Sequence, residues 1–274
     1  MAGRPSPIPY CGTPPSPAEL AGRWNLDPVL IACLIAIAAA YLWAARRTGV
    51  ERGRVGCFAV GWAITAAALV SPLCPLSVSL FAARVGQHMG LTLVAAPLVA
   101  LGRPFDVFRA LAPGGPIGSP SPGPEASKTP IVAAGLYAVL LWCWHTPIPY
   151  EFTFESTVAY WLMHLTLFGA ALWLWTALLV PSRPSPFWAI GAGLFSTVQM
   201  GFLGALITLA PHAIFTPHLL TTYAWGLTPL QDQQIGGALM WVPGCVAFLG
   251  AAMYELWRVI EARPARPMPV QAPV

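Results

Sequence analysis

Charged residues are scarce in this sequence. Asp, Glu, Lys and Arg make up 9% of its 274 residues, against about 25% in ordinary soluble domains. Hydrophobic residues make up 57%. A surface with so little charge would not stay in water, which excludes a soluble globular enzyme, a nucleic-acid-binding domain and a disordered tail. The net charge of +4 is too small to indicate a polyanionic partner, so we expect no binding to nucleic acid.

Motifs for common chemistry are missing as well. The sequence has no H-E-x-x-H, no G-x-S-x-G, no P-loop and no Gly-rich dinucleotide fingerprint between a strand and a helix. It has no C-x-x-C, and no C-x-x-C-H for covalent haem. Because no pair of acids converges either, we predict that the protein is not an enzyme and has no catalytic residues.

Long apolar runs are what the sequence does contain. A helix needs about 20 apolar residues to cross the ~30 Å hydrocarbon core of a bilayer, and backbone in lipid must satisfy its own hydrogen bonds. We therefore predict an all-α, polytopic membrane bundle with seven transmembrane helices. The predicted spans are Pro28–Ala45, Val55–Val70, Ser77–Leu101, Pro130–His145, Val158–Val180, Phe187–Leu209 and Ile235–Trp257.

The distribution of Lys and Arg predicts the orientation. With the N-terminus outside and the C-terminus in the cytoplasm, eleven of the fourteen basic residues lie on the cytoplasmic side, as the positive-inside rule requires. The predicted organisation is a polar, Pro-rich outer segment (residues 1–23), a transmembrane domain (24–260) with an irregular cytoplasmic loop at about 102–129, and a short cytoplasmic tail (261–274). The first segment lacks the apolar core of a cleavable signal peptide.

All five histidines fall on the predicted outer side. His88 and His164 lie in the outer halves of spans three and five, and His145 ends span four. His212 and His218 lie in the loop between spans six and seven. Ionisable groups at membrane depth are costly and usually have a partner or a role. The alternative for any single His is that it only forms a structural hydrogen bond.

Helical spacing places several polar residues on shared faces. Arg84, Gln87 and His88 stand at i, i+3 and i+4, and Tyr160 and His164 stand at i, i+4. Lipid offers these groups no hydrogen bonds, so both faces are expected to turn into the bundle.

Soft sulfur donors occur at a similar depth, namely Met89, Met163, Met240, Cys74 and Cys143. Imidazole together with thioether or thiolate favours copper, above all Cu(I), over Mg²⁺ or Ca²⁺. We predict transient copper binding by His88, His145 and His164. Candidate supporting residues are Gln87, Met89, Met163 and Asp232.

Simpler interpretations of these residues stay open. The two methionines stand one position from a His and therefore on a different helix face, which favours packing roles for them. Asp232 at the start of span seven is suited to capping that helix. Cys11, like Cys33, Cys57 and Cys245, is interpreted as a small apolar residue. The alternative is that Cys11 and Cys74 form a disulfide in an oxidising outer compartment.

Three stretches resemble the integral-membrane CtaG family of cytochrome c oxidase assembly factors. Their order along the chain, within the same seven spans, makes the match specific, and the resemblance covers about residues 24–257. The stretches are Gln87-His88-Met89 leading to Ala96-Pro97-Leu98 and Leu101-Gly102-Arg103-Pro104; Trp144-His145-Thr146-Pro147 with Tyr150, followed by His164; and Asp232-Gln233-Gln234-Ile235-Gly236-Gly237 leading to Met240-Trp241-Val242-Pro243-Gly244.

The resemblance implies a multi-pass protein of the bacterial inner (plasma) membrane that helps to form a haem-copper cytochrome c oxidase by delivering or inserting copper on the outer face. The implied partners are oxidase subunits, an exported copper chaperone and the lipid bilayer. The family pattern pairs histidines as H-M-x-Q-H and H-x-x-E-H. This chain keeps the second His of each pair, His88 and His164, and has Arg84 and Tyr160 in place of the first. That departure weakens the implied metal site.

Other classes of function remain alternatives. A membrane transporter of copper or a small solute should carry polar groups along its whole path, whereas the inner halves of the spans are nearly all apolar. A b-type haem membrane protein would need two facing ligands, for which His88 and His164 are candidates. A structural scaffold for oxidase subunits would need none of the histidines.

Overall fold

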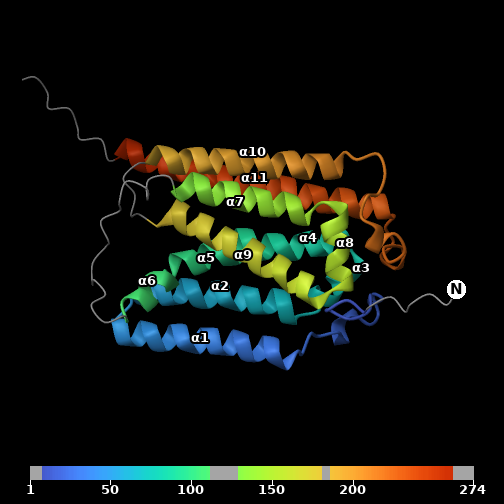
Figure 1. Ribbon diagram of the computed structural model, residues 1–274, viewed down its shortest axis with the longest axis horizontal. Helices are drawn as coiled ribbons and strands as arrows, with labels where there is room; N and C mark the ends of the chain where they lie inside the picture. The colour runs from blue at the N-terminus through green and yellow to red at the C-terminus, as the bar shows by residue number, and fades with distance from the viewer. Residues whose placement is uncertain (1–7, 112–128, 181–185, 262–274) are drawn as a thin grey trace, which may run out of the picture.

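The structure is a computed structural model that describes residues 8–111, 129–180 and 186–261. Most helices run side by side along the long axis, and one short helix, α8, crosses one end of the bundle (Figure 1). We call this end the α8 end. The α-helices are α1 (Pro28–Thr48), α2 (Arg52–Val70), α3 (Leu73–Ser79), α4 (Phe81–Met89), α5 (Ala96–Leu101), α6 (Pro104–Arg109), α7 (Thr129–Trp144), α8 (Pro147–Glu155), α9 (Thr157–Leu179), α10 (Pro186–Thr208) and α11 (Pro229–Glu261).

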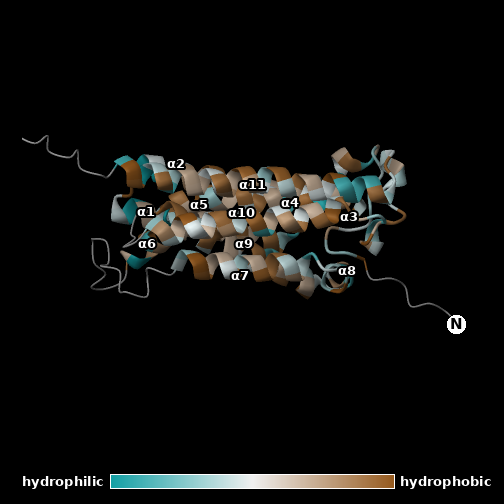
Figure 2. Cartoon of the chain, turned by 90° about the horizontal axis from the view of Figure 1, so that it is seen from above, coloured by the Kyte–Doolittle hydropathy of each residue, from teal (hydrophilic) through white to brown (hydrophobic). Residues whose placement is uncertain are grey.

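The predicted fold class is confirmed. The described residues contain helices and no strand, and six helices are long and apolar enough to cross a membrane. The number becomes seven if α7 and α8, which meet at a bend of 71°, form one broken span. Hydrophobic residues gather along the middle of the bundle, and hydrophilic residues are most evident near its ends (Figure 2).

The predicted third span, Ser77–Leu101, is wrong at its start. Leu80 has extended backbone (φ −127°, ψ 130°), which separates α3 from the helix that begins at Phe81. From there α4, a π-helical stretch (Gly90–Ala95) and α5 continue to the predicted end. The loop predicted to be irregular at about 102–129 begins with the short helix α6, and residues 112–128 lie outside the described residues.

The seventh span is longer than predicted. It begins at Pro229 rather than Ile235, and ends at Glu261 rather than Trp257. Asp232 and Gln233 in the added first turns are buried, with hydrogen bonds to other elements. Helix therefore continues past the apolar run that marked the span in the sequence. The predicted tail beyond Glu261 lies outside the described residues.

The N-terminal segment folds over the α8 end. We call residues 8–27 the strap. A disulfide joins Cys11 to Cys74, so the interpretation of Cys11 as an apolar filler was wrong and the disulfide alternative holds. The Tyr10 ring packs on Tyr160, at 4.7 Å between ring centroids, and its hydroxyl donates to Asp27 at 2.6 Å. Burial raises the pKa of Tyr10, whereas this hydrogen bond lowers the pKa of Asp27.

Helices α10 and α11 pack through small residues. A Cβ atom added to Gly204 would lie 2.8 Å from the backbone nitrogen of Trp241 and 2.9 Å from the carbonyl oxygen of Gly237. The two backbones therefore touch at this crossing, as is common where membrane helices carry glycine.

Gly204→Ala is expected to destabilise the bundle by about 1–3 kcal/mol, because the new methyl group must push two helix backbones apart. Thermal unfolding of purified protein in detergent measures the change. Gly191→Ala is the matched control on the same helix, since nothing lies within 4 Å of a Cβ added there. Equal losses in both variants would contradict the close crossing.

Candidate functional site

Three buried imidazoles converge near the α8 end. His88 comes from α4, His164 from α9, and His145 follows the last residue of α7. The ring centroids of His88 and His164 are 5.1 Å apart, and those of His88 and His145 are 5.9 Å apart. Each side chain is at most 4% exposed. We call these three residues the imidazole cluster; they are the three predicted metal ligands, and the fold brings them together.

Hydrogen bonds fix the proton on two of these rings. Nδ1 of His145 lies 2.8 Å from the Leu141 carbonyl oxygen, and Nδ1 of His164 lies 2.9 Å from that of Tyr160. A carbonyl oxygen only accepts, so each Nδ1 must carry the hydrogen. In a neutral imidazole, Nε2 then keeps its lone pair. Both Nε2 atoms are buried without a hydrogen-bond partner among the described residues, as are both ring nitrogens of His88.

The cluster is therefore rich in acceptors and poor in donors. Buried polar atoms are normally paired, and each exception asks for a physical reason. Among the residues that the structure describes, no three His, Cys, Asp or Glu side chains are arranged as a ready metal site. The rings lie close together, but their arrangement in this structure is not that of a ready metal site.

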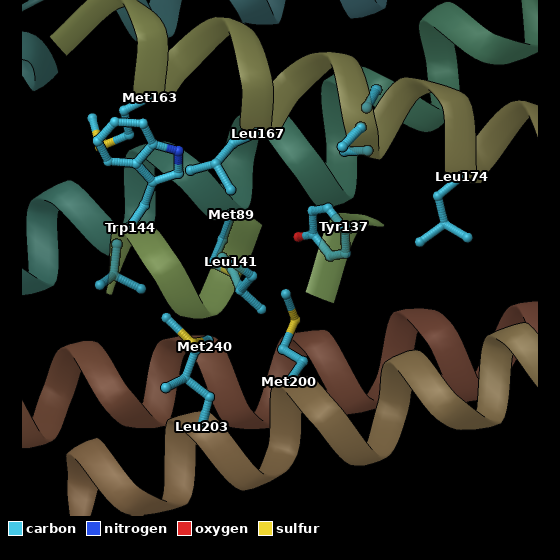
Figure 3. Packing of buried hydrophobic residues seen from close by; sticks show 14 of the residues in the cluster. Met89, Tyr137, Leu141, Trp144, Met163, Leu167, Leu174, Met200, Leu203 and Met240 are labelled. Atoms are coloured by element: carbon cyan, nitrogen blue, oxygen red, sulfur yellow. The ribbon is translucent and has the colours of Figure 1, made fainter. Parts of the chain in front are cut away.

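The predicted supporting residues separate into two groups. Gln87 is fully buried, donates its amide to the Ala68 carbonyl at 2.7 Å and leaves its own amide oxygen without a partner in the described part of the chain. Met89 and Met163 belong to the hydrophobic core, where Met163 lies beside Trp144 (Figure 3). The packing role that helix periodicity favoured for the two methionines is thus what the structure shows.

Asp232 caps a helix, but not the one expected. Its two carboxylate oxygens accept from the backbone N–H groups of Phe81, at 2.6 Å, and Ala82, at 3.0 Å. These are the first residues of α4, whereas the sequence had suggested that Asp232 caps its own helix, α11. The carboxylate thus anchors the start of the helix that carries His88, and both of its oxygens are engaged there.

Asp232→Ala is expected to cost about 1–3 kcal/mol of stability, because two buried N–H groups at the positive end of α4 lose their acceptor. The apparent Tm in detergent measures the loss. Gln234→Ala is the matched control, since that side chain is exposed one half-turn further along α11. If both variants melted at the same temperature, the capping role would be refuted.

Arg84 lies one helical turn before His88 and is 1% exposed. Its Nη2 donates to the Thr153 hydroxyl at 2.7 Å, and its guanidinium carbon lies 4.3 Å from the centroid of the Phe154 ring. The rings of Tyr150 and Tyr160 are also within cation–π distance, at 5.3 and 5.7 Å. No carboxylate in the described ranges lies within 4 Å of it. A positive charge that has no carboxylate within 4 Å among the described residues therefore borders the imidazole cluster.

Sequence reasoning missed a second buried pair. The Tyr150 hydroxyl lies 2.7 Å from Nε2 of His218, which comes from the loop after α10. Burial lowers the pKa of His218 to about 3, so the ring stays neutral at physiological pH. No spacing rule connects residues 68 positions apart, so the sequence held no signal for this contact. His212 is exposed and lies outside the imidazole cluster.

An apolar pocket of about 440 Å³ adjoins the cluster. Its walls come from α1, α2 and α9, and include Trp62, Trp161 and Phe168. His164 also forms part of its wall, although the Nε2 atom itself is buried. The pocket thus meets the imidazole cluster at His164.

Comparison with known proteins agrees with this arrangement. Residues 39–262, most of the chain, match the sequence profile of the Caa3_CtaG family, described as cytochrome c oxidase caa3 assembly factor. The imidazole cluster, Arg84 and Asp232 all lie within the matched range. No curated protein and no solved structure matches the chain. The resemblance inferred from the three sequence stretches is confirmed, and the chain belongs to the family of cytochrome c oxidase caa3 assembly factors.

Proposed function

We propose that this membrane protein assists oxidase assembly by holding Cu(I) at the imidazole cluster and releasing it to an oxidase subunit. The observation that carries the proposal is the tautomer of His145 and His164. Each donates Nδ1–H to a backbone carbonyl and leaves a buried Nε2 lone pair free. Histidines that bind metals almost always donate their other ring nitrogen in this way. Copper is here the cargo, and the role is not enzymatic.

The donor set supports Cu(I) rather than a hard cation. Three neutral imidazoles supply nitrogen, whereas hard cations prefer oxygen. Asp232 is the one carboxylate among the candidate ligands, and it is engaged in capping α4. The neighbouring charge of Arg84 opposes cation binding. A weakly held ion leaves faster, which suits a protein that passes its cargo on.

The distribution of arginines supports copper transfer at the outer face of the membrane. Figure 1 shows the C-terminal end of α1, the start of α2 and α6 at the end of the bundle opposite α8. These ends carry Arg46, Arg47, Arg52, Arg54 and Arg103. The positive-inside rule favours the cytoplasmic side for these ends, which supports a position of the imidazole cluster near the outer face of a bacterial plasma membrane. An exported copper chaperone and the oxidase subunits can both reach that face.

The alternatives gain less support. Bis-His haem needs two rings on opposite sides of a macrocycle, whereas the rings of His88 and His164 pack edge to face at 5.1 Å. A transporter needs polar groups along its full path. The described buried polar residues gather mostly toward the α8 end, and the other half of the bundle is mainly apolar.

The test is complementation of a deletion strain. Without the gene, we expect membranes to contain oxidase subunits with a lowered copper-to-haem ratio and little oxidase activity. The wild-type gene and the His212→Ala variant should restore both, because His212 is exposed outside the cluster. His88→Ala/His164→Ala should restore neither. A deletion strain with normal oxidase copper and activity would refute the proposal, and rescue by the double variant would reduce the role to scaffolding.

A further inference from the structure

The Cys11–Cys74 disulfide lies beside the imidazole cluster. Cys74 is fully buried and Cys11 is 8% exposed. The Tyr160 hydroxyl lies 3.4 Å from the Cys11 sulfur and 3.6 Å from the Cys74 sulfur. The ring of the same tyrosine packs on His164, at 4.2 Å between ring centroids. One side chain thus connects the sulfur pair with the predicted copper ligands.

Two hydrogen-bond donors contact these sulfurs. Disulfide sulfurs carry no hydrogen, so the Tyr160 hydroxyl must be the donor in both contacts. The Asn25 amide adds a third, at 3.5 Å from the Cys74 sulfur. A disulfide sulfur gains little from such donors, whereas a thiolate is a strong acceptor because it is charged. Arg84, which lacks a carboxylate within 4 Å in the described residues, lies 5.7 Å from the ring of Tyr160. The surroundings therefore fit negative charge on sulfur.

We propose that Cys11 and Cys74 are a redox-controlled entry site for Cu(I). In the oxidised state the disulfide ties the strap across the α8 end. In the reduced state the two thiolates bind one Cu(I), and the ion then moves past Tyr160 to the imidazole cluster. Thiolates are soft ligands and favour Cu(I) over hard cations. This inference rests on the proposed function and adds a separate, switchable site to it.

The electrons come from a protein dithiol in the outer compartment. One of its thiolates attacks the Cys11 sulfur, the more exposed of the two, so that the disulfide breaks and Cys74 leaves as a thiolate. The second thiol of the donor then attacks the mixed disulfide and releases Cys11. Two electrons and two protons reach the pair, and the donor is left with a disulfide. Binding of Cu(I) displaces the two protons and gives a complex of charge −1, which Arg84 partly balances.

The strap provides the movement. Besides the disulfide, it is fixed by the packing of Tyr10 on Tyr160 and Trp161. The Ser79 hydroxyl also donates to the Pro15 carbonyl at 3.0 Å, and Asn25 donates to the backbone carbonyls of Val70 and Leu69. Reduction removes the covalent tie and leaves these contacts. The residues around Cys11 can then move away from Cys74 without unfolding of the helix bundle.

The experiment measures Cu(I) bound per chain by competition with a chromogenic Cu(I) chelator. It uses full-length protein in which Cys33, Cys57, Cys143 and Cys245 are replaced by Ser, so that only the pair remains. Protein reduced with dithiothreitol and desalted without oxygen is expected to bind one Cu(I) more than oxidised protein, with an added ultraviolet thiolate–copper absorption. Alkylation and mass spectrometry must show two new thiols in the reduced sample and none in the oxidised one.

Two variants separate this inference from the proposed function. His88→Ala/His164→Ala should keep the additional Cu(I), because the sulfur pair is intact, even if the imidazole cluster binds nothing. Cys11→Ser/Cys74→Ser should lose the additional Cu(I) under both conditions. The comparison of oxidised and reduced protein does not depend on the folding of any variant. A reduced pair that binds no further Cu(I), or a disulfide that dithiothreitol cannot open in folded protein, would overturn the inference.

Discussion

Cu(I) bound by the purified protein is expected to dissociate far more readily after His88→Ala/His164→Ala, with affinity falling by more than about 100-fold. Loss of a residue that only orients a ligand costs about 10- to 100-fold in metal affinity, and this variant removes two of the three proposed ligands. His88 is the shared member, since its ring contacts both of the others, at 5.1 and 5.9 Å. Only His145 would remain, and a single imidazole cannot hold the ion against a competing chelator.

The measurement is a titration of oxidised protein, with the disulfide closed, against chelators of graded Cu(I) affinity. His212→Ala is the matched control, because it removes an imidazole that is exposed and outside the cluster. Helical circular dichroism and size-exclusion profiles must agree among the three proteins. If the double variant and the control bind Cu(I) with the same affinity as the wild type, the imidazole cluster is not the copper site.

Most of the fold could be predicted from the sequence, because a chain that crosses lipid must form apolar helices long enough to span the bilayer. Each apolar run of sufficient length became a helix, and α1, α2, α9 and α10 begin within a few residues of the predicted positions. The break at Leu80 could not be predicted in this way. It is stabilised by Asp232, whose carboxylate accepts from the N–H groups of Phe81 and Ala82, about 150 positions earlier in the chain. Hydropathy along the chain carries no information about such a contact.

The candidate site, like the fold, has one part that helix periodicity predicts and another part that depends on contacts between distant segments. The depth of His88, His145 and His164 and their helix faces follow from periodicity, and that was enough to expect them together. The Cys11–Cys74 bond, the cap from Asp232 and the pair Tyr150–His218 join segments far apart in sequence. These contacts depend on how helices pack, which spacing within one helix cannot specify. Most of the strap, in particular, lies in the segment that was predicted only to be polar, Pro-rich and on the outer side (residues 1–23).

Arg84→Met is expected to raise the Cu(I) affinity of the imidazole cluster by about 100-fold. Arg84 and His88 stand one helical turn apart, where side chains are about 6 Å from each other. At that distance two unit charges repel by about 3 kcal/mol with an effective dielectric constant of 20, and 1.4 kcal/mol corresponds to a factor of ten in affinity. Removing the guanidinium removes this repulsion from the bound ion.

The substitution should leave the fold intact, because the aromatic rings around Arg84 can pack equally well against an apolar side chain. Phe154, Tyr150 and Tyr160 surround the guanidinium with aromatic rings, against which a flexible thioether packs well. The Thr153 hydroxyl also keeps a partner, since it donates to the Tyr150 carbonyl at 2.6 Å. A buried charge is costly unless it is paired, and Arg84 has no carboxylate within 4 Å among the described residues. A raised apparent Tm is therefore expected alongside the higher affinity.

Arg84→Lys separates charge from shape, since it keeps the positive charge and loses the planar guanidinium. Its Cu(I) affinity should stay near that of the wild type if repulsion is what weakens the site. If instead Arg84→Met leaves the affinity unchanged or lowers it, the guanidinium does not act on the ion, and the bound copper lies elsewhere than beside His88.

A tighter site should also release its cargo more slowly. Arg84→Met in the deletion strain is therefore expected to restore less oxidase copper than the wild type does, although it binds copper better, because retention would replace transfer.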